Sequence, residues 1–312
     1  MITGGAGFVG VNLASKLLVN GITPFILDYL PNEKNIDHKF LSFSFDEVEY
    51  VNVDVTKREQ VLNTIEKIAP DYIIHLASMT DLTKDFPHAL QSAEINIKGT
   101  LHLLESIHIT PVESFVILST SDVYGGVNVP FREDQAVIPA SPYSVSKVSA
   151  ELYALMFHRV YDLPVTILRS FNLFGKYQRP TRVIPYIILE LLSNNEVQLT
   201  SGKQKREFNY IDDLLDAIFL SLITPESQGK IINIGCGESI SIYDLAVMIA
   251  KKFNKMDKLK FGAIPHRSNE IWDMYCDNTL AKSVLNWEPK VTFEDGINRT
   301  IKWYKENFLP PE

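Results

Sequence analysis

The sequence predicts a doubly wound α/β fold, a parallel sheet with helices on both faces, followed by a smaller C-terminal α/β lobe. Over the first ~170 residues, short apolar runs alternate with longer amphipathic stretches, as expected of successive βαβ units. Residues 25–27, 72–74 and 115–118 are apolar without alternation, which is typical of strands buried on both faces. A glycine-rich turn at residues 4–10 opens the first unit.

The first half of the chain is expected to supply five strands, at residues 24–27, 48–53, 72–76, 114–119 and 165–169. Helices are expected at residues 10–20, 57–68, 89–107 and 143–161. Only Met1, Ile2 and Thr3 precede the glycine-rich turn, whereas a strand normally takes ~5 residues. We therefore expect either an unusually short first strand or native residues before Met1.

The second half has a different texture. Residues 170–182 hold Gly, Pro, Asn and Arg with little periodicity, which predicts a loop. Helices are then expected at residues 184–194, 212–223, 242–254, 280–285 and 293–308, with short strands at 197–199, 230–234 and 259–261. We predict a first domain over residues 1–172 and a substrate-binding lobe over 173–312, with part of residues 205–235 returning to the first domain.

Composition narrows the class of protein. The chain has 312 residues, of which 46% are hydrophobic and 22% charged, as in ordinary globular proteins. A formal net charge of −8 without a basic block argues against nucleic-acid binding. Cys236 and Cys276 stand in no CxxC pattern, so we expect no metal site. The lack of a ~20-residue apolar run or signal peptide predicts a cytoplasmic protein without a membrane segment.

The glycine-rich turn, Gly4-Gly5-Ala6-Gly7-Phe8-Val9-Gly10, stands between a strand and a helix. Glycines let a pyrophosphate approach the backbone, and the helix N-terminus offers N–H donors to it. Asp28 ends the next strand, 18 residues after Gly10, where an acid that binds the ribose hydroxyls belongs. Its charge would repel a 2′-phosphate, which favours NAD over NADP. Each feature alone also fits a plain turn, but together they predict a Rossmann-type dinucleotide site.

A second motif carries the chemistry. Among the 13 tyrosines, only Tyr143 has a lysine, Lys147, four positions later. On a helix this spacing puts both side chains on one face, and a nearby ammonium lowers the phenol pKa from its usual ~10. Thr120 follows a buried strand, where it can hydrogen-bond the same substrate oxygen. We therefore predict a base that takes the proton of an alcohol during oxidation.

Together these residues resemble the extended short-chain dehydrogenase/reductase family, in its nucleotide-sugar epimerase and dehydratase branch, over nearly the whole chain. The resemblance implies NAD as cofactor and a nucleotide-diphosphate sugar as substrate. It implies catalytic roles for Tyr143, Lys147, Thr120 and Asp122. It implies cofactor contacts at Gly4, Gly7, Phe8, Val9, Gly10, Asp28, Asp54, Val55, Leu76, Ala77 and Lys147.

The resemblance also reaches the second lobe. Asn172 matches the segment beside the sugar phosphate, and Asn96 matches a structural asparagine. Arg206, Arg267 and Glu270 match the residues that hold the nucleotide diphosphate and ribose. Two arginines would suit the ~2 negative charges of a diphosphate, because each can form charge-assisted, bidentate bonds. Either arginine alone also fits a surface salt bridge.

The implied reaction begins with removal of the C4 hydroxyl proton by Tyr143 and of the C4 hydride by NAD⁺, which leaves a 4-keto sugar. Return of the hydride to the other face of the sugar gives the C4 epimer. Loss of the C5 proton and of the C6 hydroxyl as one water, with return of the hydride to C6 and of a proton to C5, gives a 4-keto-6-deoxy sugar. An enzyme that releases the reduced cofactor is a net 4-dehydrogenase, and one that catalyses the reverse reaction is a 4-ketoreductase.

Asp122 separates these outcomes. The dehydratases of the family carry a glutamate there, and thymidine-linked sugar dehydratases usually carry an aspartate where Ser121 stands. The usual acid pair is absent, which favours a UDP-hexose-type 4-epimerase with Asp122 as a turn acid. A 4,6-dehydratase with Asp122 as the C5 base is the alternative, followed by a 4-dehydrogenase or 4-ketoreductase. A non-catalytic dinucleotide-binding protein is the remote alternative.

The helices expected at residues 89–107 and 143–161 resemble those that pair family members as homodimers through a four-helix bundle. Their apolar residues could equally face the chain's own sheet. We predict a homodimer from the resemblance.

Overall fold

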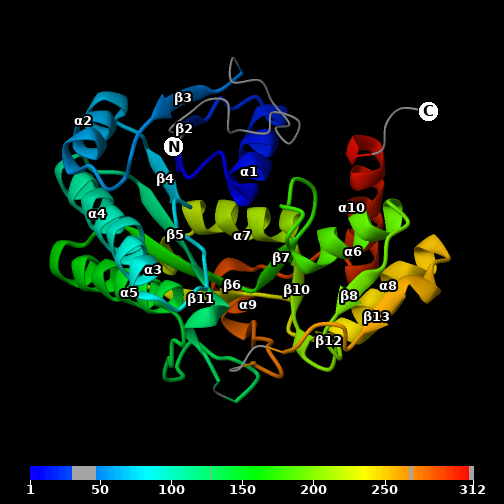
Figure 1. The fold of residues 1–312 in the computed structure, drawn as a ribbon. Helices are drawn as coiled ribbons and strands as arrows, with labels where there is room; N and C mark the ends of the chain where they lie inside the picture. The colour runs from blue at the N-terminus through cyan, green and yellow to red at the C-terminus, as the bar shows by residue number, and fades with distance from the viewer. Residues whose placement is uncertain (30–46, 127, 267–269, 309–312) are drawn as a thin grey trace.

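The computed structural model describes residues 1–29, 47–126, 128–266 and 270–308. Its centre is a seven-stranded parallel sheet in the order β11-β6-β5-β4-β1-β2-β3 (Figure 1). The strands are β1 (Ile2–Thr3), β2 (Phe25–Asp28), β3 (Glu49–Asn52), β4 (Tyr72–His75), β5 (Ser114–Thr120), β6 (Val165–Ser170) and β11 (Ile231–Ile234). The strand order reverses between β1 and β4, and ligands of such sheets bind beyond the carboxyl ends of the strands at this point. The predicted doubly wound fold is confirmed.

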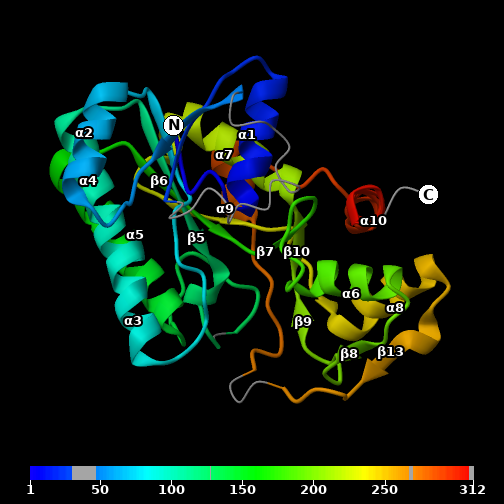
Figure 2. The same ribbon diagram turned by 45° about the horizontal axis from the view of Figure 1, so that its top comes forward.

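Helices cover both faces of the sheet (Figures 1 and 2). One face carries α2 (Arg58–Ile68), α4 (Gly99–Ile109) and α5 (Pro142–Tyr161), and the other carries α1 (Phe8–Val19) and α7 (Ile211–Ile223). A separate apolar cluster fills the space under each layer, with Phe115 and Ile117 in one and Val116 in the other. Burial on both faces explains why these strands are apolar without alternation.

The helix expected at residues 89–107 is longer and less regular than the pattern predicts. It begins as α3 (Phe86–Ser92), where the Asp85 side chain accepts a hydrogen bond from the His88 N–H. A π-helical segment (Ala93–Lys98) then leads into α4. The wider π turn contains Asn96, whose side chain bonds both Met79 and Ser146. This segment therefore ties the loop after β4 to the start of α5.

Small sheets organise the second half. β7 (Asn172–Phe174) pairs in parallel with β10 (Phe208–Tyr210), so the expected loop at residues 170–182 is wrong for these three residues and for Ser170, which ends β6. Two further pairs join β12 (Ile240–Ser241) to β9 (Lys205–Arg206), and β13 (Leu259–Phe261) to β8 (Val197–Leu199). The remaining helices are α6 (Val183–Leu192), α8 (Ile242–Phe253), α9 (Thr279–Leu285) and α10 (Phe293–Phe308), close to the expected bounds.

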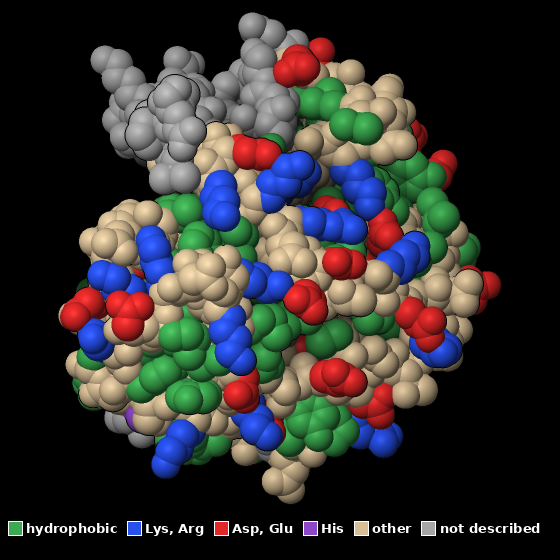
Figure 3. Space-filling view, turned by 90° about the vertical axis from the view of Figure 1, so that its right-hand side faces the viewer, with side chains coloured by type: hydrophobic (Ala, Val, Ile, Leu, Met, Phe, Trp, Pro, Cys, Tyr) green, Lys and Arg blue, Asp and Glu red, His purple; other side chains and the backbone are tan. Residues whose placement is uncertain are grey.

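Two groups of elements lie side by side (Figure 2). α6, α8, α10, β8 and β13 stand beside the large sheet, whereas β11 pairs with β6 and α7 packs on α1. On the face that carries α8 and α10, positive and negative side chains are interspersed (Figure 3). Within the described ranges, no helix is long and apolar enough to cross a membrane.

Candidate active site

The catalytic residues expected from the sequence begin at the carboxyl end of β5. β5 ends at Thr120, and a 3₁₀ turn (Ser121–Val123) follows. The Thr120 Oγ1 accepts a hydrogen bond from the Asp122 N–H at 3.2 Å and donates one to the Asp122 Oδ2 at 3.1 Å. Thr120 therefore caps the turn, and its hydroxyl orients the Asp122 carboxylate.

Tyr143 and Lys147 lie in the first two turns of α5. Ser141 caps the helix reciprocally with Ser144: its Oγ accepts the Ser144 N–H at 3.1 Å, and the Ser144 Oγ accepts the Ser141 N–H at 3.0 Å. The Ser146 Oγ donates to the Tyr143 carbonyl and accepts from Asn96 at 2.8 Å. These bonds fix where the helix begins, and thereby place Tyr143 and Lys147 one turn apart on it.

The electrostatics of Tyr143 differ from the expectation. Burial raises the pKa of its phenol, and the negative charge of Asp122 raises it further. A hydrogen bond with Thr120 and the positive charge of Arg182 lower it by less. Burial also lowers the pKa of the Lys147 ammonium to about 8. The expectation that Lys147 brings the phenol close to neutral titration is therefore not met, because burial is the larger effect.

The glycine-rich turn is shaped for close approach. Gly4 has a φ of +68°, and a Cβ there would lie 2.5 Å from the Ala77 nitrogen. A Cβ on Gly10 would lie 2.5 Å from the Gly5 Cα. Neither position has room for a side chain, and the close packing at Gly4 brings the predicted cofactor residues Leu76 and Ala77 beside it.

The N-terminus of α1 is open to an anion. Gly7 is its N-cap and provides no side-chain hydrogen bond, and the first turn, which includes Phe8 and Val9, holds no acidic residue. The first N–H groups of a helix have no partner within the helix, and they carry its positive dipole end. This arrangement fits the diphosphate of a dinucleotide.

Asp28 lies at the end of β2, above the glycine-rich turn. Its Oδ2 accepts the Ala6 N–H at 2.9 Å, and its Oδ1 accepts the Tyr29 N–H at 2.8 Å. Burial raises the pKa of this carboxyl, and the two hydrogen bonds oppose that rise. Each oxygen has a second lone pair, so the carboxylate can hold the turn and also accept from ribose hydroxyls.

The other predicted cofactor residues lie at the same edge of the sheet. After β3, the Asp54 Oδ1 accepts the Thr56 N–H at 2.9 Å and the Thr56 hydroxyl at 2.7 Å. Val55 is buried, and its side chain packs against Gly99. The structure therefore brings the residues after β1, β2, β3, β4 and β5 to one edge of the sheet, as the parallel topology requires.

The predicted substrate residues lie in the second half of the chain. The Asn172 amide donates to the Glu207 carbonyl at 3.1 Å. Arg206 forms a salt bridge with Glu270, and the side chains are 17% and 9% exposed. The structure thus joins Arg206 to Glu270. Arg267 lies outside the described residues.

The described residues include buried charged side chains to which the sequence assigned no role of their own, among them Glu151, Arg169 and Glu207. Glu207 is fully buried between Arg206 and Phe208, where its carboxylate accepts the Gly237 and Cys276 N–H groups, each at 2.8 Å. Burial raises its pKa to about 7. In the sequence, the one indication of Glu207 is its position beside Arg206, a predicted substrate residue. That position does not distinguish a buried acid from an exposed one.

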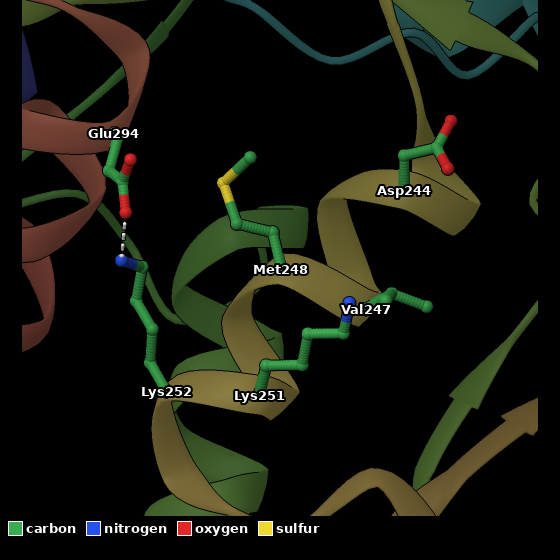
Figure 4. Close-up of a pocket in the computed structure, with 6 residues that line it drawn as sticks. All are labelled: Asp244, Val247, Met248, Lys251, Lys252 and Glu294. Atoms are coloured by element: carbon green, nitrogen blue, oxygen red, sulfur yellow. Dashed lines mark hydrogen bonds and ion pairs between the residues drawn. The ribbon is translucent and has the colours of Figure 1, made fainter.

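The pocket in Figure 4, about 470 Å³ in volume, lies elsewhere, between α8 and α10. It is spanned by the ion pair of Lys252 and Glu294, whose Nζ and Oε1 are 2.7 Å apart. None of the predicted site residues lines it. In the described part of the chain, no group of three or more His, Cys, Asp or Glu side chains could hold a metal ion.

Comparisons with known proteins relate the chain to two kinds of enzyme. A family model described as GDP-mannose 4,6 dehydratase matches residues 1–300. A UDP-glucuronate 4-epimerase from Thermodesulfobacterium geofontis is 30% identical, over 98% of this chain and 96% of that protein. A dTDP-D-glucose 4,6-dehydratase from Homo sapiens is 31% identical, over 99% of this chain and 90% of that protein.

A solved structure agrees with these comparisons. The UDP-glucuronic acid 4-epimerase from Bacillus cereus, in complex with UDP-glucuronic acid and NAD, is 28% identical and matches with a TM-score of 0.87. The match covers 98% of this chain and 99% of that one. The similarity therefore extends through both halves of the chain.

Proposed function

The chain belongs to the GDP-mannose 4,6-dehydratase-like family of NAD-dependent nucleotide-sugar epimerases and dehydratases, and we propose that it acts as a UDP-hexose-type 4-epimerase. In this proposal, the sugar of a nucleotide-diphosphate substrate is oxidised at C4 and then reduced at the same carbon from its other face. The conclusion rests on one observation, the set of carboxylates around Tyr143.

Two carboxylates act on the Tyr143 phenol in the described part of the chain, Asp122 and Glu151. Glu151 is engaged by Arg169 and Ser119, which leaves Asp122. The neighbouring Ser121 contributes a hydroxyl, which bonds the Met274 sulfur at 3.5 Å. Elimination of water across C5 and C6 needs a base for the C5 proton and an acid for the C6 oxygen. Epimerisation needs only the proton transfer at Tyr143. A single carboxylate that no buried arginine holds therefore favours epimerisation.

The residues present fit NAD. The open N-terminus of α1 and the glycines at positions 4, 7 and 10 would hold the diphosphate, and Asp28 would accept bonds from the adenosine ribose. Asp54, Val55, Leu76 and Ala77 would line the remainder of the cofactor site, and Lys147 would hold the nicotinamide ribose. When bound, NAD supplies acceptance and return of the C4 hydride.

Tyr143 moves the proton in this proposal. Burial raises the pKa of its phenol, which favours the protonated form. A positive charge placed beside the phenol lowers the pKa, so the oxidised cofactor and Lys147 would together favour the phenolate. The Thr120 hydroxyl, which lowers the pKa of the phenol, would hydrogen-bond the C4 oxygen as it becomes a carbonyl.

The second half of the chain would bind the nucleotide. We assign the diphosphate to Arg206 and Arg267, the ribose hydroxyls to Glu270, and the sugar phosphate to the neighbourhood of Asn172. The pairing of Arg206 with Glu270 supports this assignment, because it presents a cation and an acceptor side by side.

A 4,6-dehydratase is the second candidate. It is favoured by Asp122, whose carboxylate acts on the Tyr143 phenol and is already oriented by Thr120. A carboxylate so placed has the chemistry needed to take a C5 proton.

A cytoplasmic homodimer completes the proposal. α3 and α5 pack against each other and expose large apolar side chains, including Phe86, Leu90 and Leu152, which are 87%, 69% and 61% exposed. A second copy of the same surface would bury them.

Proton NMR in D₂O distinguishes the candidates. The purified protein is given NAD⁺ and a panel of nucleotide hexoses. The proposal predicts a new C4 epimer without deuterium at C5. Loss of water with deuterium at C5 would instead establish the dehydratase with Asp122 as base. A 4-keto product with NADH absorbance and no loss of water would establish a 4-dehydrogenase.

A further inference from the structure

Three charged side chains lie buried together behind the Tyr143 site. Lys147, Glu151 and Arg169 are 3%, 2% and 3% exposed. A buried charge is costly unless an opposite charge or hydrogen bonds compensate it. Two of the three are cations, and Glu151 is the one anion among them.

Arg169 holds Glu151 in a fixed position. Its Nη2 lies 2.7 Å from the Glu151 Oε2, and its Nε lies 3.1 Å from the Oε1. This is the two-pronged geometry that restricts a carboxylate most strongly. The Ser119 hydroxyl also donates to the Glu151 Oε1. Arg169 itself lies over the Tyr124 ring, 4.8 Å from its centroid. Two neighbouring strands, β5 and β6, thus fix the carboxylate.

Lys147 lies one helical turn before Glu151 on α5, so the two side chains share a face of the helix. Charged and titratable groups act on this pair from three elements. His75, at the end of β4, interacts with Lys147, whereas Arg169 on β6 and Tyr143 on α5 interact with Glu151. Asp122, in the turn after β5, acts on Tyr143. His75 is buried and neutral, because burial and the Lys147 charge lower its pKa to about 3.

We propose that Glu151 is a positioning residue, the counter-ion that keeps Lys147 protonated and directed along α5 toward Tyr143, with Arg169 and Ser119 holding it in place. The burial of Lys147 favours the neutral amine, and Glu151 opposes this effect. The consequence for catalysis rests on the proposed function, because a neutral Lys147 would give the Tyr143 phenolate no charge to stabilise it.

Titration of the Lys147 ammonium tests the proposal without cofactor or substrate. The protein is labelled with ¹³C at the lysine Cε, the Lys147 signal is assigned with Lys147→Arg, and its chemical shift is followed against pH. We expect a midpoint of about 8 in the unaltered protein. In Glu151→Gln the midpoint should fall by about one pH unit or more, because an opposite charge is lost. Ser119→Ala keeps the charge and removes one hydrogen bond, so its midpoint should stay unchanged.

An unchanged midpoint in folded Glu151→Gln would overturn the proposal. If that variant does not fold, Glu151→Asp provides the test, because it withdraws the charge by one methylene and should lower the midpoint by a smaller amount. The second readout is turnover of whichever nucleotide hexose the protein converts. Glu151→Gln should lose activity between pH 7 and 8 and regain it toward pH 6, whereas an equal loss at every pH would indicate a purely structural role. Because the titration needs no turnover, it succeeds or fails independently of the proposed function.

Discussion

At the scale of single residues, the candidate site depends on the oxygen of Tyr143. The phenol lies beside Thr120, and its pKa is raised by burial and by Asp122. The sequence predicted the pair of Tyr143 and Lys147 from a spacing of four, which a helix places on one face. It did not predict the direction of the pKa shift, because burial depends on packing that one sequence does not display.

Tyr143→Phe removes the proton-transferring oxygen and retains the ring. We expect turnover to fall by about 10²–10⁴-fold, the usual contribution of a general acid–base group. NAD binding should remain, as measured by the protection that NAD gives the protein against thermal unfolding. Tyr153→Phe is the matched control, because that residue lies on the same helix and is 40% exposed. A Tyr143→Phe variant with full activity would contradict the assigned role.

Glu207 gives a pH dependence of stability. Its pKa is raised from 4.5 to about 7 in the folded state, so the folded protein holds the proton more tightly than the unfolded chain. Stability should therefore fall as the pH rises from 4.5 to 7, by on the order of 3 kcal/mol from this residue. Urea unfolding at pH 5 and pH 8 measures the decline. In Glu207→Gln, the decline in stability should be smaller by the contribution of Glu207. An equal decline in both proteins would show that Glu207 does not cause it.

At the scale of elements, the glycine-rich turn and the capped start of α5 position the site. The turn could be predicted because three glycines and Asp28 stand at informative spacings. The short strands β7, β9, β10 and β12 could not, because two or three residues carry too little pattern and each strand is formed by pairing with a distant segment. The π turn at Asn96 escaped prediction for the same reason: its hydrogen bonds reach Met79 and Ser146.

Gly4→Ala tests the close approach of the turn to the segment after β4. Its Cβ would lie 2.5 Å from a backbone nitrogen, so we expect loss of NAD binding and a destabilisation of more than about 2 kcal/mol. Gly21→Ala separates the two causes, because Gly21 has a similar φ of +75° and nothing within 4 Å of its Cβ position. That control should cost only about 1–2 kcal/mol and retain NAD binding. Equal NAD affinity in both variants would show that the turn tolerates a side chain.

At the scale of the whole molecule, the parallel sheet follows from the sequence because its strands are buried on both faces. The parallel topology then gathers residues from the ends of β1, β2, β3, β4 and β5 at one edge. What could not be predicted is the buried pair of Glu151 and Arg169, or the separate burial of Glu207, because an acid or a base at one position reveals neither its partner nor its burial. The division into domains at residue 172 remains a prediction.

The proposed homodimer is tested through the exposed face of α5. Leu152→Glu places a charge among the apolar side chains of α3 and α5, and we expect the dimer to dissociate. Light scattering during size-exclusion chromatography measures the mass. Ile223→Glu is the control, because Ile223 is 70% exposed on α7, away from that face, and its variant should remain dimeric. A monomeric unaltered protein would contradict the proposal.

In the proposed reaction, the hydrogen on C4 of the sugar leaves as a hydride and returns to the same carbon. The most direct measurement follows a deuterium label at C4 of a nucleotide hexose that the enzyme converts, with bound NAD, by NMR and mass spectrometry of the product. We expect the C4 epimer with the deuterium still on C4. Deuterium on C6 would contradict the epimerase and indicate a dehydratase, and loss of the label to the solvent would contradict hydride transfer itself.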